Sequence, residues 1–161
     1  MATQKLQQPI IDILNARLQD EYNAERFYIA ASLWCDLNGF EIASEYFVKE
    51  YKDERKHAHK LQKYASNWNV KLLLPTVSAD PDFSDIKAIA QAAYDIEVAL
   101  YDSYCADVKA IGEVLPQAEL FLYEFVQIQN DAVVSYSDIL KKLEGIEGKF
   151  ELLQVEEKIF K

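Results

Sequence analysis

Four helix-length stretches of the sequence each carry a stripe of apolar residues, and each stripe is interrupted near its middle by residues that bind metals well. Members of a stripe are three or four residues apart, which sets them on one face of a helix. A carboxylate on such a face is costly to bury unless it is paired, hydrogen-bonded or bound to a metal. The pattern therefore predicts helices packed around one shared polar site, supplied by Glu21, Glu54, His57, Glu97 and Gln129.

The breaks between these stretches delimit the predicted helices. Asn38-Gly39 is typical of a helix stop and a tight turn, Pro75 and Pro81 interrupt the chain after the second stretch, and Gly112 ends the third. We expect helices over about 7–37, 40–68, 83–111 and 116–144, followed by a short amphipathic helix over about 149–160. The whole chain, residues 1–161, is interpreted as a single domain.

The lengths of the connections predict the topology. The first and third connections are short, so each joins two antiparallel helices. The middle connection, residues 69–82, could span about 46 Å when extended at about 3.3 Å per residue. A helix of about 29 residues is about 43 Å long, so this connection can travel the length of the bundle. The expected fold is all-α, a four-helix bundle with one long crossover between its second and third helices.

The polar residues lie near the middle of each predicted helix, and mid-helix positions meet at one level of a bundle. Glu54 and His57 form a Glu-x-x-His pair whose spacing sets a carboxylate and an imidazole on one face. The pair alone is also compatible with a solvated helix face. Joined by Glu21, Glu97 and Gln129, it predicts a metal centre with carboxylate-rich ligands, which suits iron or manganese better than structural zinc.

Neighbouring residues allow more than one interpretation. Tyr28 lies two turns after Glu21, and its hydroxyl either bonds a ligand carboxylate or belongs to an ordinary core tyrosine. Glu25 and Glu50 each lie one turn from a proposed ligand. They either pass cations to the site or, as we favour, face solvent at the edge of the stripe.

Bulk composition narrows the function classes. The formal net charge of −10 argues against a nucleic-acid-binding protein, which would carry a basic stripe. Cys35 and Cys105 are too few for a disulfide framework and suit a reducing compartment. The N-terminus lacks the apolar core of a signal peptide, and no apolar run reaches the length of a membrane span. We therefore expect a cytoplasmic protein with no membrane partner.

The chain resembles the bacterial non-haem ferritins over nearly its whole length. The matching features are Glu21 to Cys35 with Tyr28 and Trp34-Cys35, Asn38-Gly39-Phe40-Glu41, Asp53-Glu54-Arg55-Lys56-His57, Tyr94-Asp95-Ile96-Glu97 and Gln129. The resemblance implies a ferritin-like fold with a C-terminal fifth helix. It also implies a homo-oligomeric, 24-subunit cage that stores iron as a ferric mineral.

The same resemblance implies a ferroxidase activity at a di-iron centre. Glu21, Glu54 and His57 would form one iron site, and Glu54 would bridge to a second site completed by Glu97 and Gln129. Tyr28 would lie beside them. Fe(II) would be oxidised there by dioxygen or hydrogen peroxide.

Two departures from related proteins bear on cofactors. Asp53 and Asp131 match two acids of a third iron site found in related ferritins, but Ile128 and Ala132 replace carboxylates, so that site is expected to be weakened or lost. Bacterioferritins bind haem through a methionine just after the bridging glutamate. Arg55 holds that position here, so no haem is expected.

Two other functions compete with the iron-storage ferroxidase. A storage-only or structural cage subunit would bind metal without rapid oxidation. An intact set of buried acids would then lower stability without serving a reaction, which counts against this alternative. A small stress-protection cage of the DNA-binding starved-cell type would have ligands at subunit interfaces. The ligand set within one subunit and the acidic chain count against that alternative.

Overall fold

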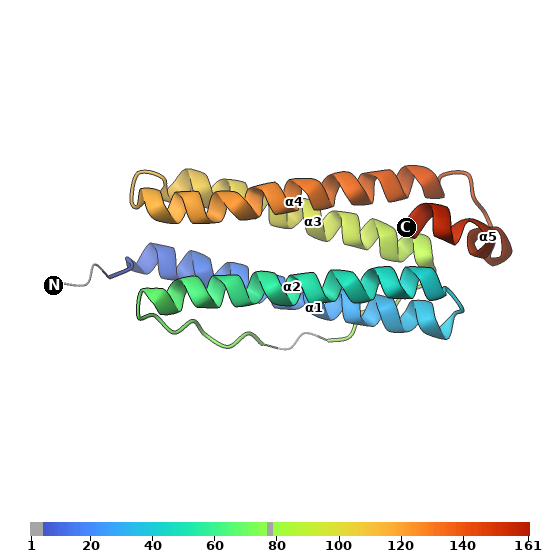
Figure 1. Cartoon of the computed structure of the whole chain (residues 1–161), viewed down its shortest axis with the longest axis horizontal. Helices are drawn as coiled ribbons and strands as arrows, with labels where there is room; N and C mark the ends of the chain where they lie inside the picture. Colours follow the sequence, from blue (N-terminus) through green and yellow to red (C-terminus); the bar gives the residue numbers. More distant parts are fainter. Residues whose placement is uncertain (1–4, 77–78) are drawn as a thin grey trace.

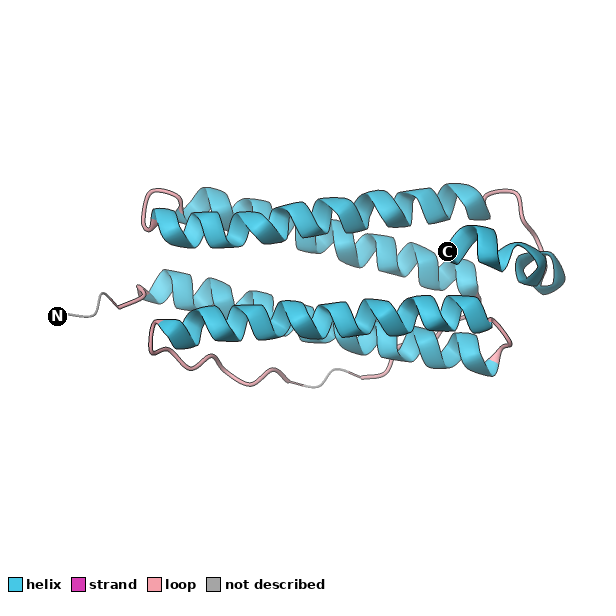
Figure 2. Ribbon diagram, viewed as in Figure 1, coloured by secondary structure: helices cyan, strands magenta, loops and turns pink. Residues whose placement is uncertain are grey.

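The computed structural model describes residues 5–76 and 79–161, and within them the fold is all-α (Figure 2). Its helices are α1 (Gln8–Leu37), α2 (Glu41–Asn67), α3 (Ile86–Ile111), α4 (Pro116–Leu143) and α5 (Lys149–Phe160). Helices α1 and α2 form one antiparallel hairpin, and α3 and α4 form another. The two hairpins pack side by side along their long axes (Figure 1). The predicted four-helix bundle is confirmed.

Local chemistry explains where the helices begin and end. Gly39, after α1, has a φ of +82°, a left-handed conformation that glycine adopts without strain. Pro116 begins α4, where a missing N–H costs nothing. We predicted that the third helix starts near Phe83 or Ser84. It begins at Ile86, because the side chain of Asp85 caps it by accepting from the N–H of Ala88 at 2.8 Å.

The described parts of the connection between α2 and α3, residues 68–76 and 79–85, lie along the bundle between its two ends, as the length of the connection predicted (Figure 1). Polar side chains of α1 hold it in place. Asn15 accepts from the N–H of Leu73 at 2.8 Å, and Gln19 exchanges hydrogen bonds with the backbone of Thr76 at 2.9 and 3.1 Å. Because the chain crosses the full length of the bundle, α2 and α3 run parallel, and the middles of all four long helices lie at one level.

Helix α5 packs across the end of the bundle where α1 turns into α2 (Figure 1). Leu152, Ile159 and Phe160 are buried there. Glu156, also buried, accepts a hydrogen bond from the N–H of Ala43 at 2.6 Å. This N–H lies in the first turn of α2, which has no side-chain cap of its own, so the α5 carboxylate satisfies a donor that the helix leaves free. None of the described helices is both long and apolar enough to cross a membrane.

Candidate metal centre

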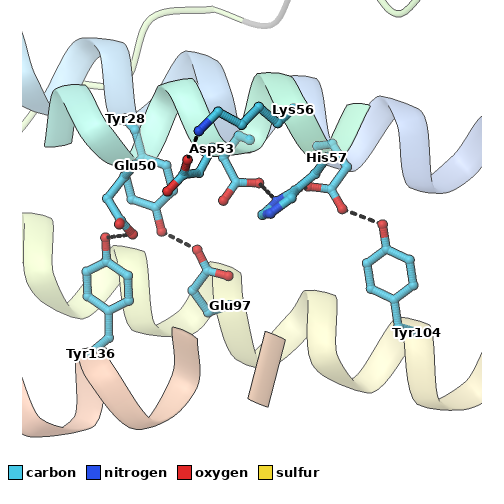
Figure 3. Close-up of polar contacts among 10 residues, drawn as sticks. Tyr28, Glu50, Asp53, Lys56, His57, Glu97, Tyr104 and Tyr136 are labelled. Carbon is cyan, nitrogen blue, oxygen red and sulfur yellow. Dashed lines mark hydrogen bonds and ion pairs between the residues drawn. The ribbon is translucent and has the colours of Figure 1, made fainter. Parts of the chain in front are cut away.

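A glutamate from α1 and a glutamate–histidine pair from α2 meet in the middle of the bundle. Glu21, Glu54 and His57 each offer one ligand atom, and these atoms lie within 4.8 Å of one another. His57 Nδ1 is 3.2 Å from Glu54 Oε2 and 3.6 Å from Glu21 Oε2. Glu54 and His57 are one turn apart on α2, so the helix itself aims both side chains at the same point (Figure 3).

The other two predicted ligands are equally buried but come from the second hairpin. Glu97 lies on α3 and Gln129 on α4, and neither side chain is exposed to solvent. Glu97 is outside the group formed by the α1 and α2 ligands, and its carboxylate contacts Tyr28. The bundle therefore buries three glutamates and a glutamine on the inner faces of its four long helices, as the sequence pattern predicted.

Several polar atoms of this region have no hydrogen-bond partner. Within the described residues, these include Oε2 of Glu21, Oε2 of Glu97 and both amide atoms of Gln129. Each such buried atom costs about 1–3 kcal/mol, and more when it is charged. The oxygen atoms in this set are the kind of group that a bound cation satisfies. Carboxylate oxygens with one imidazole nitrogen form a donor set that suits iron or manganese.

The ionisation of these groups reflects their mutual burial. Burial lowers the pKa of His57, but the nearby carboxylates of Glu21 and Glu54 outweigh it and raise that pKa to about 10. Burial raises the pKa of Glu54 well above its usual value, and raises that of Glu97 to about 7. Burial also acts on Glu21, yet bonds to its neighbours lower its pKa. Without a metal the cluster therefore holds protons that a cation would displace.

Two tyrosines hold the ligand carboxylates in a reciprocal arrangement. Tyr28 of α1 donates its hydroxyl hydrogen to Glu97 of α3, and Tyr104 of α3 donates to Glu21 of α1 (Figure 3). Of the two interpretations of Tyr28, the structure supports the hydrogen bond to a carboxylate that the sequence predicts as a ligand. Tyr104 was not among the residues that the sequence pattern singled out. The signal was present, because Tyr104 follows Glu97 by seven residues, as Tyr28 follows Glu21.

The two flanking glutamates have different environments. We expected Glu25 at the solvent edge, but Glu25 is only 6 % exposed. Its Oε1 accepts from Nε of Arg55 at 2.7 Å and lies 2.6 Å from Nη2 of the same guanidinium. This correction arises because α2 presents the guanidinium directly beside α1. Glu50 is half-buried and accepts a hydrogen bond from the hydroxyl of Tyr136 at 2.9 Å.

The two acids at the predicted positions of a third site have separate environments. The carboxylate of Asp53 contacts the ammonium group of Lys56 at 2.7 Å, and Asp131 on α4 is exposed. Ile128 and Ala132 contribute no ligand atom. The weakening of such a site stays a prediction.

Comparisons with known proteins agree with this architecture. The sequence pattern of the ferritin family, described as a ferritin-like domain, matches residues 11–146. A probable bacterial non-heme ferritin-like protein of Haemophilus influenzae is 25% identical over 148 residues, which are 89% of this chain and 90% of that protein. A bacterial non-heme ferritin of Staphylococcus aureus is 30% identical over 82 residues, 50% of this chain and 49% of that protein.

Solved structures share the fold. A novel open pore ferritin from the hyperthermophilic archaeon Archaeoglobus fulgidus superposes with a TM-score of 0.90. The superposition covers 96% of this chain and 98% of that one, at 22% sequence identity. A humanized archaeal ferritin gives a TM-score of 0.89 at 20% identity. At these identities the likeness concerns the arrangement of helices.

Proposed function

Because this chain belongs to the ferritin-like domain family, we propose that it is an iron-storage protein with ferroxidase activity. It oxidises Fe(II) to Fe(III) at an intrasubunit di-iron centre and keeps the product as a ferric mineral inside a cage of identical subunits. The observation that carries this proposal is the set of buried ligand atoms without hydrogen-bond partners on Glu21, Glu97 and Gln129. Such atoms are costly in a folded protein unless a cation binds them.

Each ligand has a proposed role. Glu21 and His57 bind the first Fe(II), and Glu54 bridges to the second, which Glu97 and Gln129 complete. Two Fe(II) ions give one electron each to dioxygen, which takes up two protons from solvent and leaves as hydrogen peroxide, or to hydrogen peroxide, which takes up two protons and leaves as two waters. These are the substrates and oxidants that we assign.

The two reciprocal tyrosine bonds support this chemistry by fixing carboxylate orientation. Tyr28 and Tyr104 each donate to one oxygen of a ligand glutamate. The other oxygen, Oε2 in both Glu97 and Glu21, has no hydrogen-bond partner and is free to bind iron. Hydrogen bonds from neighbouring groups of this kind orient metal ligands and tune their affinity.

The remaining features of the proposal follow from the family and the sequence. We assign the chain to one ferritin-like domain over residues 1–161, a 24-subunit homo-oligomer and a cytoplasmic location. We assign no haem, because Arg55 follows Glu54 and its guanidinium is bound to Glu25. The cage requires contacts between subunits, for which exposed apolar side chains such as Leu33 and Leu37 are available.

The test uses stopped-flow absorbance after anaerobic protein, loaded with Fe(II), meets dioxygen. We expect rapid oxidation in the parent protein and its loss in the double variant Glu54→Ala/His57→Ala. The matched control is Glu41→Ala/His59→Ala, which removes an exposed glutamate and an exposed histidine from the same helix. Rapid oxidation that survives in the first double variant would refute the ferroxidase assignment. Cage assembly, measured by light scattering, should be kept in both.

A further inference from the structure

Beside the proposed ligands lies a buried tyrosine that metal binding does not use. Tyr136, on α4, has no exposed surface, and its hydroxyl donates to Glu50 Oε2 at 2.9 Å. Figure 3 shows this pair next to Tyr28 and Glu97, on the far side of the cluster from Tyr104. Neither Tyr136 nor Glu50 belongs to the ligand set, so their pairing at this depth calls for another explanation.

The ring of Tyr136 is stacked on the ring of Tyr28. The two ring centroids are 6.0 Å apart and the planes differ by 8°. Tyr28 in turn donates to the proposed ligand Glu97. A continuous path therefore leads from a metal ligand through one phenol to a second phenol, and ends at a carboxylate able to accept a proton. Electron tunnelling falls steeply with distance, and adjacent stacked rings present a short gap.

The tyrosine on the opposite side of the centre has different neighbours. Tyr104 stacks on Phe125, with centroids 4.9 Å apart, and Phe125 contacts Phe121. A phenylalanine ring has no ionisable proton and is far harder to oxidise than a phenol. Among the residues that the structure describes, Tyr28 therefore stacks on a second oxidisable ring, whereas Tyr104 stacks on a phenylalanine.

We propose that Tyr136 is a one-electron donor to the metal centre, acting through Tyr28, with Glu50 as the acceptor of its phenolic proton. This inference rests on the proposed ferroxidase function. Burial raises the pKa of Glu50 above its usual value, which makes its carboxylate a stronger proton acceptor than an exposed one. The oxidant is hydrogen peroxide at a centre that holds a single Fe(II).

The electrons and protons of this step balance. Hydrogen peroxide needs two electrons and two protons to become two waters; Fe(II) gives one electron, Tyr28 gives the other, and solvent supplies the two protons. Tyr28 passes its phenolic proton to Glu97 as it is oxidised. An electron from Tyr136 then restores Tyr28, which recovers that proton, while the proton of Tyr136 moves to Glu50.

The radical on Tyr136 is removed by the next Fe(II). That ion gives one electron and becomes Fe(III), and the proton held by Glu50 returns to the phenolic oxygen. The consequence is protective. A lone Fe(II) is a one-electron donor and would otherwise cleave peroxide to a hydroxyl radical beside its own ligands, whereas Tyr136 supplies the second electron from outside the ligand set.

The test mixes anaerobic protein carrying one Fe(II) per subunit with hydrogen peroxide, freezes the mixture within milliseconds and records electron paramagnetic resonance. The parent protein should give a tyrosyl radical whose hyperfine pattern includes Tyr136. Tyr136→Phe should lose that component. Glu50→Gln, which keeps the shape and an acceptor oxygen but cannot take up the proton, should lose most of it. Circular dichroism checks that both variants are folded.

The matched control is Tyr64→Phe, which removes a hydroxyl from a stacked tyrosine outside this path. Its radical yield and hyperfine pattern should equal those of the parent. Two results would overturn the role of Tyr136 alone. One is a radical signal in Tyr136→Phe that is identical to that of the parent protein. The other is a parent protein that oxidises iron rapidly without forming a tyrosyl radical. Absence of rapid iron oxidation in the parent, read from absorbance, would overturn the proposed function and this step with it.

Discussion

Replacing Tyr104 with phenylalanine removes one hydroxyl and leaves the stacked ring in place. In the parent, that hydroxyl donates to Glu21, a fully buried carboxylate whose second oxygen already has no hydrogen-bond partner. The phenylalanine ring can keep the 4.9 Å stacking on Phe125. The substitution therefore isolates the loss of one hydrogen bond to a buried charged group.

The expected magnitude follows from the nature of that bond. A hydrogen bond to a charged group contributes about 1.5–3 kcal/mol, and leaving the acceptor buried without a donor adds to the loss. We expect the free energy of unfolding of the metal-free Tyr104→Phe protein to fall by about 1.5–3 kcal/mol. For a domain of this size the Tm should fall by about 3–12 °C, at about 2–4 °C per kcal/mol.

Thermal and urea unfolding, followed by circular dichroism at one protein concentration, would measure this change. Tyr64→Phe is the matched control, because the hydroxyl of Tyr64 is buried without a hydrogen-bond partner and its removal should cost little. Anaerobic loading with Fe(II) should shrink the effect of Tyr104→Phe, since the metal then binds Glu21. A Tyr104→Phe protein as stable as the control, within about 0.5 kcal/mol, would refute the reasoning.

Three further predictions concern ionisation, metal and α5. The folded protein raises the pKa of Glu97 from 4.5 to about 7 and that of His57 from 6.5 to about 10. In both intervals the folded state binds more protons than the unfolded state, so the metal-free protein should lose stability as the pH rises through them. His57→Gln should flatten the upper interval in pH-dependent urea unfolding. Anaerobic Fe(II) should raise the Tm of the parent but leave that of Glu54→Ala almost unchanged, as calorimetry would show. Glu156→Ala should lower the free energy of unfolding by about 1–3 kcal/mol and speed hydrogen exchange in α5. The control Glu157→Ala, which removes an exposed glutamate, should change neither. Equal exchange in the two variants would contradict the anchoring role of Glu156.

The fold was predictable because its signals are local. Apolar residues at spacings of three and four, with Gly39 and Pro116 at breaks, define helices without reference to the rest of the chain. The crossover could be derived from its length alone. The anchoring of α5 could not, because Glu156 meets the N–H of Ala43 across 113 positions of sequence and no periodicity encodes that contact.

The candidate site was predictable to the extent that it depends on position along helices. Glu21, Glu54 and His57 lie at mid-helix on the inner stripes, and the structure brings them together. Contacts between helices were harder to predict. We predicted Glu25 at the solvent edge, but the guanidinium of Arg55 on α2 binds it and helps to cover that carboxylate. Which tyrosine donates to which glutamate depends on how the two hairpins align, and a single stripe does not encode that alignment.

The central claim is that the buried cluster oxidises iron in pairs. The most direct measurement is the amplitude of the rapid oxidation phase in stopped-flow absorbance, titrated with Fe(II) before mixing with dioxygen. If the cluster is a two-metal site, the amplitude should grow linearly and saturate at about two Fe(II) per subunit. An oxidation no faster than that of iron in buffer, or an amplitude that grows without saturating, would contradict the central claim.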